Sequence, residues 1–136
     1  MTARLDLPAN LRAELESEAR KAFPRECCGL IEGVRDGDTA RALALHPTRN
    51  LAEEPDRFEI DPAAQFALMR RARAAGHAII GCYHSHPNGV AEPSARDRES
   101  AGEEGFVWVI AGVGQGGAVA FGAFEGPDLA AISLGP

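Results

Sequence analysis

Cysteine is scarce in this chain, which has three among 136 residues, and an odd, low count does not make a disulfide framework. Positive charge is also scarce, because 14 Lys and Arg residues stand against 20 Asp and Glu residues and the net charge is -6. A nucleic-acid partner is therefore not expected, since binding phosphates needs a clustered basic surface. Arg70, Arg71 and Arg73 do occur together, but they fall on an expected helix, where a solvated face accounts for them.

Long apolar runs are lacking as well. The N-terminus is charged from Arg4 onward and has no apolar segment of the kind that signal peptides carry. Residues 105–124 are free of charge, but the glycine-rich stretch 112–117 interrupts them. We therefore expect two buried strands around a turn there, and no membrane span. These absences predict a soluble protein of the reducing cytoplasm.

The rest of the composition is that of an ordinary globular protein, with 45% hydrophobic and 25% charged residues. A chain of this length buries roughly two-thirds of the surface that its unfolded form exposes, so it supports a core without disulfides. No internal repeat or linker divides the sequence. We expect a single domain over residues 1–136.

Hydrophobic periodicity predicts helices that alternate with strands. Leu11, Leu15 and Ala19 form an apolar stripe on the first helix, and Asp36-Gly37 predicts a hairpin turn. The predicted elements are, in chain order, helix 8–23, strand 27–34, strand 39–45, loop 46–56, brief strand 57–60, helix 61–76, strand 78–86, helix 94–102 and strands 106–112 and 118–124. This order predicts an α/β sandwich around a mixed sheet.

Candidate metal ligands gather between residues 83 and 97. On the strand expected over 78–86, His84 and His86 point to the same face, so two imidazoles can meet one metal ion. Asp97 can supply a third ligand from the helix that follows. Three protein ligands with a fourth position left for water are the arrangement of catalytic zinc, whereas structural zinc sites are closed by four protein ligands.

Each of these features also has a purely structural interpretation. An isolated His-x-His pair is often the polar end of a strand. Ser94-x-x-Asp97 is typical of a helix N-terminus, where Ser caps the backbone and the helix dipole favours an acid in the first turn. The two interpretations are compatible, because a cap can also hold Asp97 in place as a ligand.

Taken together, the segment resembles the JAMM (also called MPN-plus) zinc peptidases. Their motif is a distant Glu, then His-x-His-Pro, with seven residues between the second His and a Ser-x-x-Asp. The residues of this chain that match the motif at this spacing are His84, His86, Pro87, Pro93, Ser94 and Asp97.

The distant Glu of the motif corresponds to Glu26, directly before the strand expected from Cys27 onward. Glu-Cys-Cys-Gly-Leu followed by a strand is itself typical of the small bacterial members of the family. Asn50 and the stretch 57–62 also resemble the middle region of these members. The resemblance therefore spans nearly the whole chain and shows no departure at a motif position.

The resemblance implies a cytidine-deaminase-like (JAB1/MPN) fold, a three-layer α/β/α sandwich with a mixed sheet. It also implies one zinc ion per chain, bound by His84, His86 and Asp97 with water as the fourth ligand. Zinc lowers the pKa of its bound water from about 15.7 towards about 7. Glu26 would act as general base and then as general acid, and Ser94 would donate a hydrogen bond to the oxyanion of the tetrahedral intermediate.

The function that the resemblance implies is a peptidase or isopeptidase that cleaves after the C-terminal Gly-Gly of a ubiquitin-like sulfur carrier protein. One alternative is a catalytically silent scaffold of the same fold. A zinc deaminase would need a Pro-Cys-x-x-Cys pair and a His-x-Glu, and neither is present. The DNA-repair-associated branch of the superfamily is a further alternative, although it usually carries an additional DNA-binding domain.

The other histidines and the cysteines are expected to have structural surroundings. His46 and His77 flank a loop and a helix end, where surface positions are expected. The adjacent Cys27 and Cys28 point to opposite faces of a strand, so they do not easily share a metal ion. We expect them and Cys82 to be buried among apolar residues.

Overall fold

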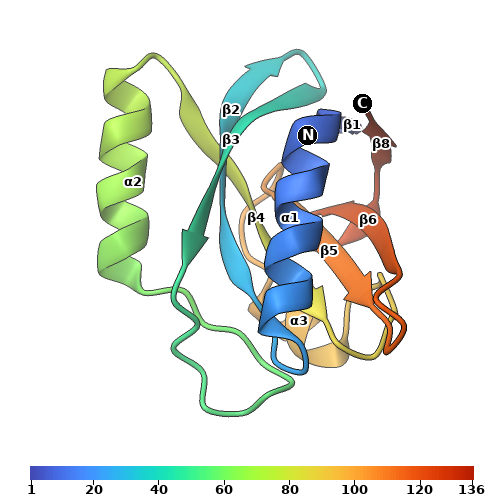
Figure 1. Cartoon of the computed structure of the whole chain (residues 1–136). Coiled ribbons are helices and arrows are strands. Elements are labelled where there is room, and N and C mark those ends of the chain that lie inside the picture. Colours follow the sequence, from blue (N-terminus) through green and yellow to red (C-terminus); the bar gives the residue numbers. More distant parts are fainter.

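The computed structural model describes residues 1–136 as one eight-stranded sheet with three helices (Figure 1). In chain order the elements are β1 (Arg4–Asp6), α1 (Ala9–Ala22), β2 (Cys28–Asp36), β3 (Thr39–Thr48), α2 (Pro62–Ala74), β4 (Ala78–His86), α3 (Ala95–Ser100), β5 (Val107–Val113), β6 (Val119–Glu125), β7 (Ala130–Ala131) and β8 (Ser133–Gly135). The strand order across the sheet is β7-β6-β5-β4-β2-β3-β1-β8. The sheet is mixed, because β4 and β5 run parallel whereas β2 is antiparallel to both β3 and β4.

The helices cover both faces of the sheet. On one face, α1 packs Leu11 and Leu15 into a core cluster that also contains Tyr83 of β4. The cluster on the opposite face consists of Leu30, Cys82, Trp108, Ile110, Phe124 and Leu129. Leu68 of α2 packs against this second cluster. The predicted α/β/α sandwich is therefore confirmed.

The central strand β4 ends where the candidate ligands lie. Its bounds, Ala78–His86, are those expected from the sequence. Asp61 caps α2 by accepting a hydrogen bond from the backbone N–H of Ala63, and Gly76 ends that helix region with a φ of 79°. A side chain is strained at such a φ, so glycine suits the turn that leads the chain into β4.

The sequence-based prediction was wrong in the middle of the chain. The brief strand expected over 57–60 is absent, and only an isolated bridge joins Asn50 to Ile60. The reason is local, because the Asn50 side chain occupies backbone groups of Arg57 and Glu59 that a strand would pair. In addition, β3 continues to Thr48 instead of ending at residue 45.

The three cysteines are buried and free, as expected, and Arg70, Arg71 and Arg73 are exposed on α2. No helix is long and apolar enough to cross a membrane.

Candidate metal centre

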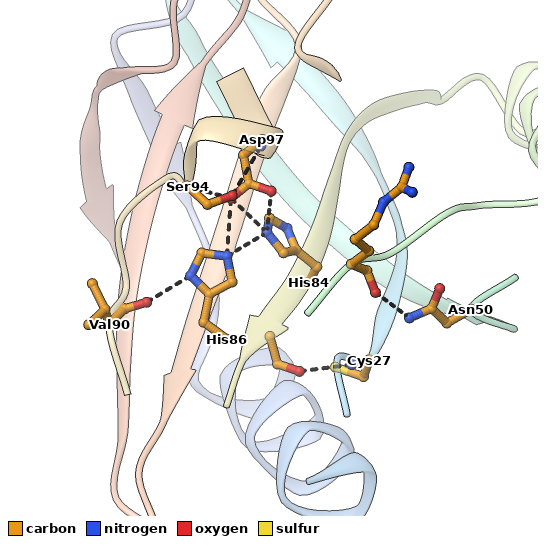
Figure 2. Close-up of polar contacts among 9 residues, drawn as sticks. Cys27, Asn50, His84, His86, Val90, Ser94 and Asp97 are labelled. Carbon is orange, nitrogen blue, oxygen red and sulfur yellow. Dashed lines mark hydrogen bonds and ion pairs between the residues drawn. The ribbon is translucent and has the colours of Figure 1, made fainter. Parts of the chain in front are cut away.

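The end of β4 brings two imidazoles into edge-on contact, with ring planes 69° apart. The Nε2 atoms of His84 and His86 lie 3.0 Å apart, and both side chains are buried (Figure 2). Their neighbour strands β2 and β5 hold β4 on both sides, so the backbone that carries the two residues is central to the sheet. The predicted same-face arrangement is confirmed.

Asp97 approaches the two imidazoles from α3. Its Oδ2 atom lies 3.2 Å from the Nε2 of His84 and 3.0 Å from the Nε2 of His86. Ser94 fixes this carboxylate through a capping box: the Ser94 N–H donates to Oδ2 at 2.9 Å, and the Asp97 N–H donates to the Ser94 Oγ at 3.1 Å. The structural interpretation of Ser94-x-x-Asp97 is therefore confirmed, and the same cap holds the Asp97 carboxylate beside the two imidazoles.

The donor set fits a tetrahedral cation. Zinc–nitrogen and zinc–oxygen bonds of about 2.0–2.2 Å place neighbouring ligand atoms roughly 3.3 Å apart, close to the observed separations. The Nδ1 of His86 bonds the carbonyl oxygen of Val90 at 2.9 Å, so in the neutral ring Nε2 is an acceptor. This acceptor faces an acceptor oxygen of Asp97, an arrangement that a cation between them stabilises.

Aromatic side chains enclose His84, the more deeply buried of the two imidazoles. Phe58 stacks on His84 with ring centroids 4.2 Å apart, and Trp108 meets the His84 ring edge-on at 5.7 Å. The Nδ1 of His84 is buried without a hydrogen-bond partner, so ring packing holds this imidazole. Sequence reasoning did not identify Phe58 or Trp108 as part of the site; the only signal was the resemblance of the stretch 57–62 to the family.

Glu26 reaches the same place from the segment before β2. One of its carboxylate oxygens and one ring nitrogen each of His84 and His86 lie within 4.8 Å of one another. Two hydrogen bonds with Ser85 link this segment to β4, because the Cys27 N–H donates to the Ser85 Oγ at 2.8 Å and the Ser85 N–H donates to the Cys27 carbonyl at 3.1 Å. Ser85 is thus a further residue of the site that spacing alone did not reveal.

Asn50 supports Glu26 from the other side. Its Nδ2 atom donates to the backbone carbonyls of Glu26 at 3.1 Å and Arg57 at 2.9 Å. Its Oδ1 atom accepts from the N–H groups of Ala52 and Glu59. Figure 2 shows Asn50 beside the centre but not pointing into it. The Asn50 side chain therefore links the two ends of the loop that carries Phe58.

The pKa values of the two carboxyl groups of the site, Glu26 and Asp97, are shifted in opposite directions. Burial raises the pKa of Glu26 to about 7, with the charge of Asp97 adding to the effect and that of His86 opposing it. Burial also disfavours ionised Asp97, but hydrogen bonds from His84 and His86 outweigh it and hold the pKa of Asp97 well below its usual range. Asp97 is therefore a permanent anion, whereas Glu26 can exchange a proton near neutral pH.

The two histidines are shifted in opposite directions. Burial lowers the pKa of His84, so its neutral form is favoured. Burial also acts to lower the pKa of His86, but the hydrogen bonds to Asp97 and Val90 raise it overall. Neutral imidazole is the form that binds a metal ion.

A cleft of about 440 Å³ opens onto this cluster, and Glu26, His86 and Ser94 are among its lining residues. The structure thus brings together all five residues predicted for the site. It does not bring in His46 and His77, whose rings bond the two carboxylate oxygens of Glu32 at 2.8 and 2.6 Å. These two rings are only partly exposed, because their hydrogen bonds to Glu32 hold them against the sheet.

Comparison with known proteins defines the class. The profile of the family described as prokaryotic homologs of the JAB domain matches residues 8–123. The chain belongs to this family, which confirms the JAMM/MPN resemblance read from its motif.

Named relatives cover most of the chain. A desampylase of Haloferax volcanii is 38% identical over 114 residues, which are 80% of this chain and 81% of the relative. A probable TtuB-protein conjugate cleaving protease of Thermus thermophilus is 30% identical over 133 residues, covering 96% and 83% of the two chains. A CysO-cysteine peptidase of Mycobacterium tuberculosis is 28% identical over 106 residues, covering 78% and 71%.

Solved structures show the same fold. A solution structure of a Desulfitobacterium hafniense protein superposes with a TM-score of 0.85 at 29% identity, covering 96% of this chain and 90% of that one. A JAB1/MPN domain protein of Archaeoglobus fulgidus superposes with a TM-score of 0.62 at 15% identity, covering 98% and 99%. The expected JAB1/MPN fold is therefore confirmed.

Proposed function

We propose that this chain is a zinc-dependent peptidase or isopeptidase that hydrolyses the bond after the C-terminal Gly-Gly of a ubiquitin-like sulfur carrier protein. The observation that carries the proposal is the convergence of His84, His86 and Asp97 with Glu26, beside a cleft that Glu26 and His86 line. Relatives named for the cleavage of TtuB–protein conjugates and of CysO-cysteine support the substrate class. We propose one catalytic domain over residues 1–136, acting in the cytoplasm.

We assign His84, His86 and Asp97 as the ligands of one zinc ion per chain, with water as the fourth ligand. When bound there, zinc supplies Lewis-acid activation of water at neutral pH. The Asp97 anion compensates the charge of the cation, and the hydrogen bond from His86 to Val90 keeps the His86 Nε2 lone pair directed at it.

Glu26 is the general base in this proposal. Its raised pKa of about 7 lets it accept a proton from water and then pass that proton to the leaving amine. The Ser94 Oγ accepts a hydrogen bond from the Asp97 N–H, so its own hydroxyl hydrogen remains free to donate to the oxyanion.

Substitutions separate metal binding from chemistry. His84→Ala and Asp97→Ala are expected to lose most of the zinc, whereas Glu26→Gln is expected to keep the zinc and lose hydrolysis by about 10²–10⁴-fold. Zinc is measured by elemental analysis. Hydrolysis is followed by intact mass on a carrier that ends in Gly-Gly and is extended by one cysteine, with a Gly-Val carrier as the matched control.

The outcomes decide between an enzyme and a scaffold. Protein produced with ample zinc that contains none would favour the catalytically silent scaffold. Loss of zinc from Glu26→Gln would make Glu26 a ligand and not the base. Equal rates on the two carriers would remove the Gly-Gly preference.

A further inference from the structure

The catalytic cleft is acidic apart from one side chain. Its lining contains the carboxylates of Glu26, Asp56 and Glu92, and Arg96 is the only Arg or Lys among the lining residues. Apart from the proposed zinc ion and the His86 ring, an anionic group of a substrate therefore meets a positive partner at one place in this cleft.

Arg96 stands at the mouth of the cleft, next to the catalytic cluster. It lies on α3 between Ser94 and Asp97, and both of these residues are held by the capping box. Its Nη1 atom is 3.8 Å from the Oδ1 of Asp56, which belongs to the loop closed by Asn50. Both side chains are more than half exposed, and such an ion pair is weak enough for a better anion to replace Asp56.

The position of Glu26 indicates which part of a substrate reaches Arg96. Glu26 hands its proton to the leaving amine, so the residue after the scissile bond lies on the side of Glu26. Asp56 and Arg96 line the same cleft as Glu26, which places this pair beside the leaving residue. In a free amino acid only the Cα atom separates the amine from the carboxylate.

We propose that Arg96 is a subsite for the α-carboxylate of a single amino acid that follows the Gly-Gly, and that it sets a preference of this chain for such conjugates over isopeptides. This inference rests on the proposed function and specifies its substrate. The reaction is the same hydrolysis: water forms the new C–O bond, the C–N bond breaks, and Glu26 passes the proton to the amine of the released amino acid.

The physical basis is a paired guanidinium and carboxylate in an otherwise acidic cleft. A planar guanidinium binds a carboxylate through two parallel hydrogen bonds, which Asp56 at 3.8 Å does not achieve. Without Arg96 the substrate carboxylate would lie among Glu26, Asp56 and Glu92 and be repelled. The side chain of a lysine in an isopeptide conjugate carries no carboxylate at this place and gains nothing from Arg96.

The test compares three conjugates of one Gly-Gly carrier. They are the carrier extended by one alanine with a free carboxylate, the same conjugate ending in a carboxamide, and an isopeptide to the Nε of a blocked lysine. We expect the zinc-loaded enzyme to favour the free carboxylate over the other two by about 10-fold to 100-fold in kcat/KM.

Variants assign this preference to Arg96. Arg96→Ala should raise KM for the free carboxylate and leave the carboxamide unchanged, so the preference falls to near one. Asp56→Asn removes the competing anion and should lower KM for the free carboxylate alone. Arg98→Ala is the matched control, because Arg98 lies on the same helix, bonds the carbonyl of Asp128 and does not line the cleft.

A binding measurement separates recognition from chemistry. In the Glu26→Gln background the conjugates are held uncleaved, and calorimetry should show the same order of affinities, abolished by Arg96→Ala. A wild-type enzyme that cleaves the carboxylate and carboxamide conjugates equally would overturn the subsite. So would an Arg96→Ala variant that retains zinc and loses all activities in parallel. Cleavage of none of the three would overturn the proposed function itself.

Discussion

Ser85→Ala tests how Glu26, the proposed base, is held next to the proposed metal ligands. Ser85 is 1% exposed and lies between the two histidines on β4, yet its side chain faces the segment before β2. Its Oγ accepts the N–H of Cys27, the residue that follows Glu26. The substitution removes the only acceptor of that N–H and leaves the backbone bond from the Ser85 N–H to the Cys27 carbonyl in place.

The expected loss follows from the burial of both partners. Cys27 is 7% exposed, so its N–H would be left without a partner away from water, which costs about 1–3 kcal/mol. For a chain of this size such a change lowers Tm by about 3–10 °C. Because Glu26 then moves relative to the histidines, kcat should fall by about 10-fold to 100-fold while zinc stays bound.

The assay combines unfolding and kinetics. Urea unfolding and thermal melts give the loss of stability, elemental analysis gives the zinc content, and kcat and KM come from the carrier–alanine conjugate. Ser85→Thr is the control, because it keeps the hydroxyl and should restore kcat. A Ser85→Ala protein with wild-type stability and kcat would refute the reasoning, since Glu26 would then be positioned by other contacts.

Two further predictions concern the same centre. In protein stripped of metal by a chelator, the pKa of Glu26 is raised to about 7 in the folded state, so folding favours the protonated carboxyl. The stability that protonated Glu26 contributes is therefore full below about pH 4.5 and is lost as pH rises through about 7. Glu26→Gln should therefore unfold like the wild type at pH 4.5 and be more stable by about 1–2 kcal/mol at pH 8, measured by urea unfolding; no difference at pH 8 would contradict the shift. Phe58→Ala removes the ring stacked on His84 and should weaken zinc binding by about 3-fold to 10-fold in a competition titration. In the same Phe58→Ala variant the fluorescence of Trp108, the single tryptophan, should shift to the red, because the Phe58 ring no longer covers it. An unchanged spectrum would mean that Phe58 does not shield Trp108 from water.

The local sequence pattern was sufficient to predict the strand and the helix next to the site. The sequence predicted the bounds of β4, a segment that is apolar at first and ends in polar residues, and it placed a helix over 61–76 where α2 lies between Asp61 and Gly76. The strand predicted over 57–60 is absent, because the backbone groups there bond the side chain of Asn50. Hydrophobic periodicity does not reveal a side-chain partner of this kind.

The sequence by itself determined which candidate ligands stand together, since His84, His86 and Asp97 follow a spacing within one strand and the next helix. The family motif also pointed to Glu26, but only the tertiary structure decided how Glu26 reaches the histidines, which rings cover His84, and that Arg96 faces Asp56. The reason is separation along the chain. Glu26 reaches the histidines through hydrogen bonds between Cys27 and Ser85, and strand pairing across the sheet, not the local order of residues, brings such distant partners together.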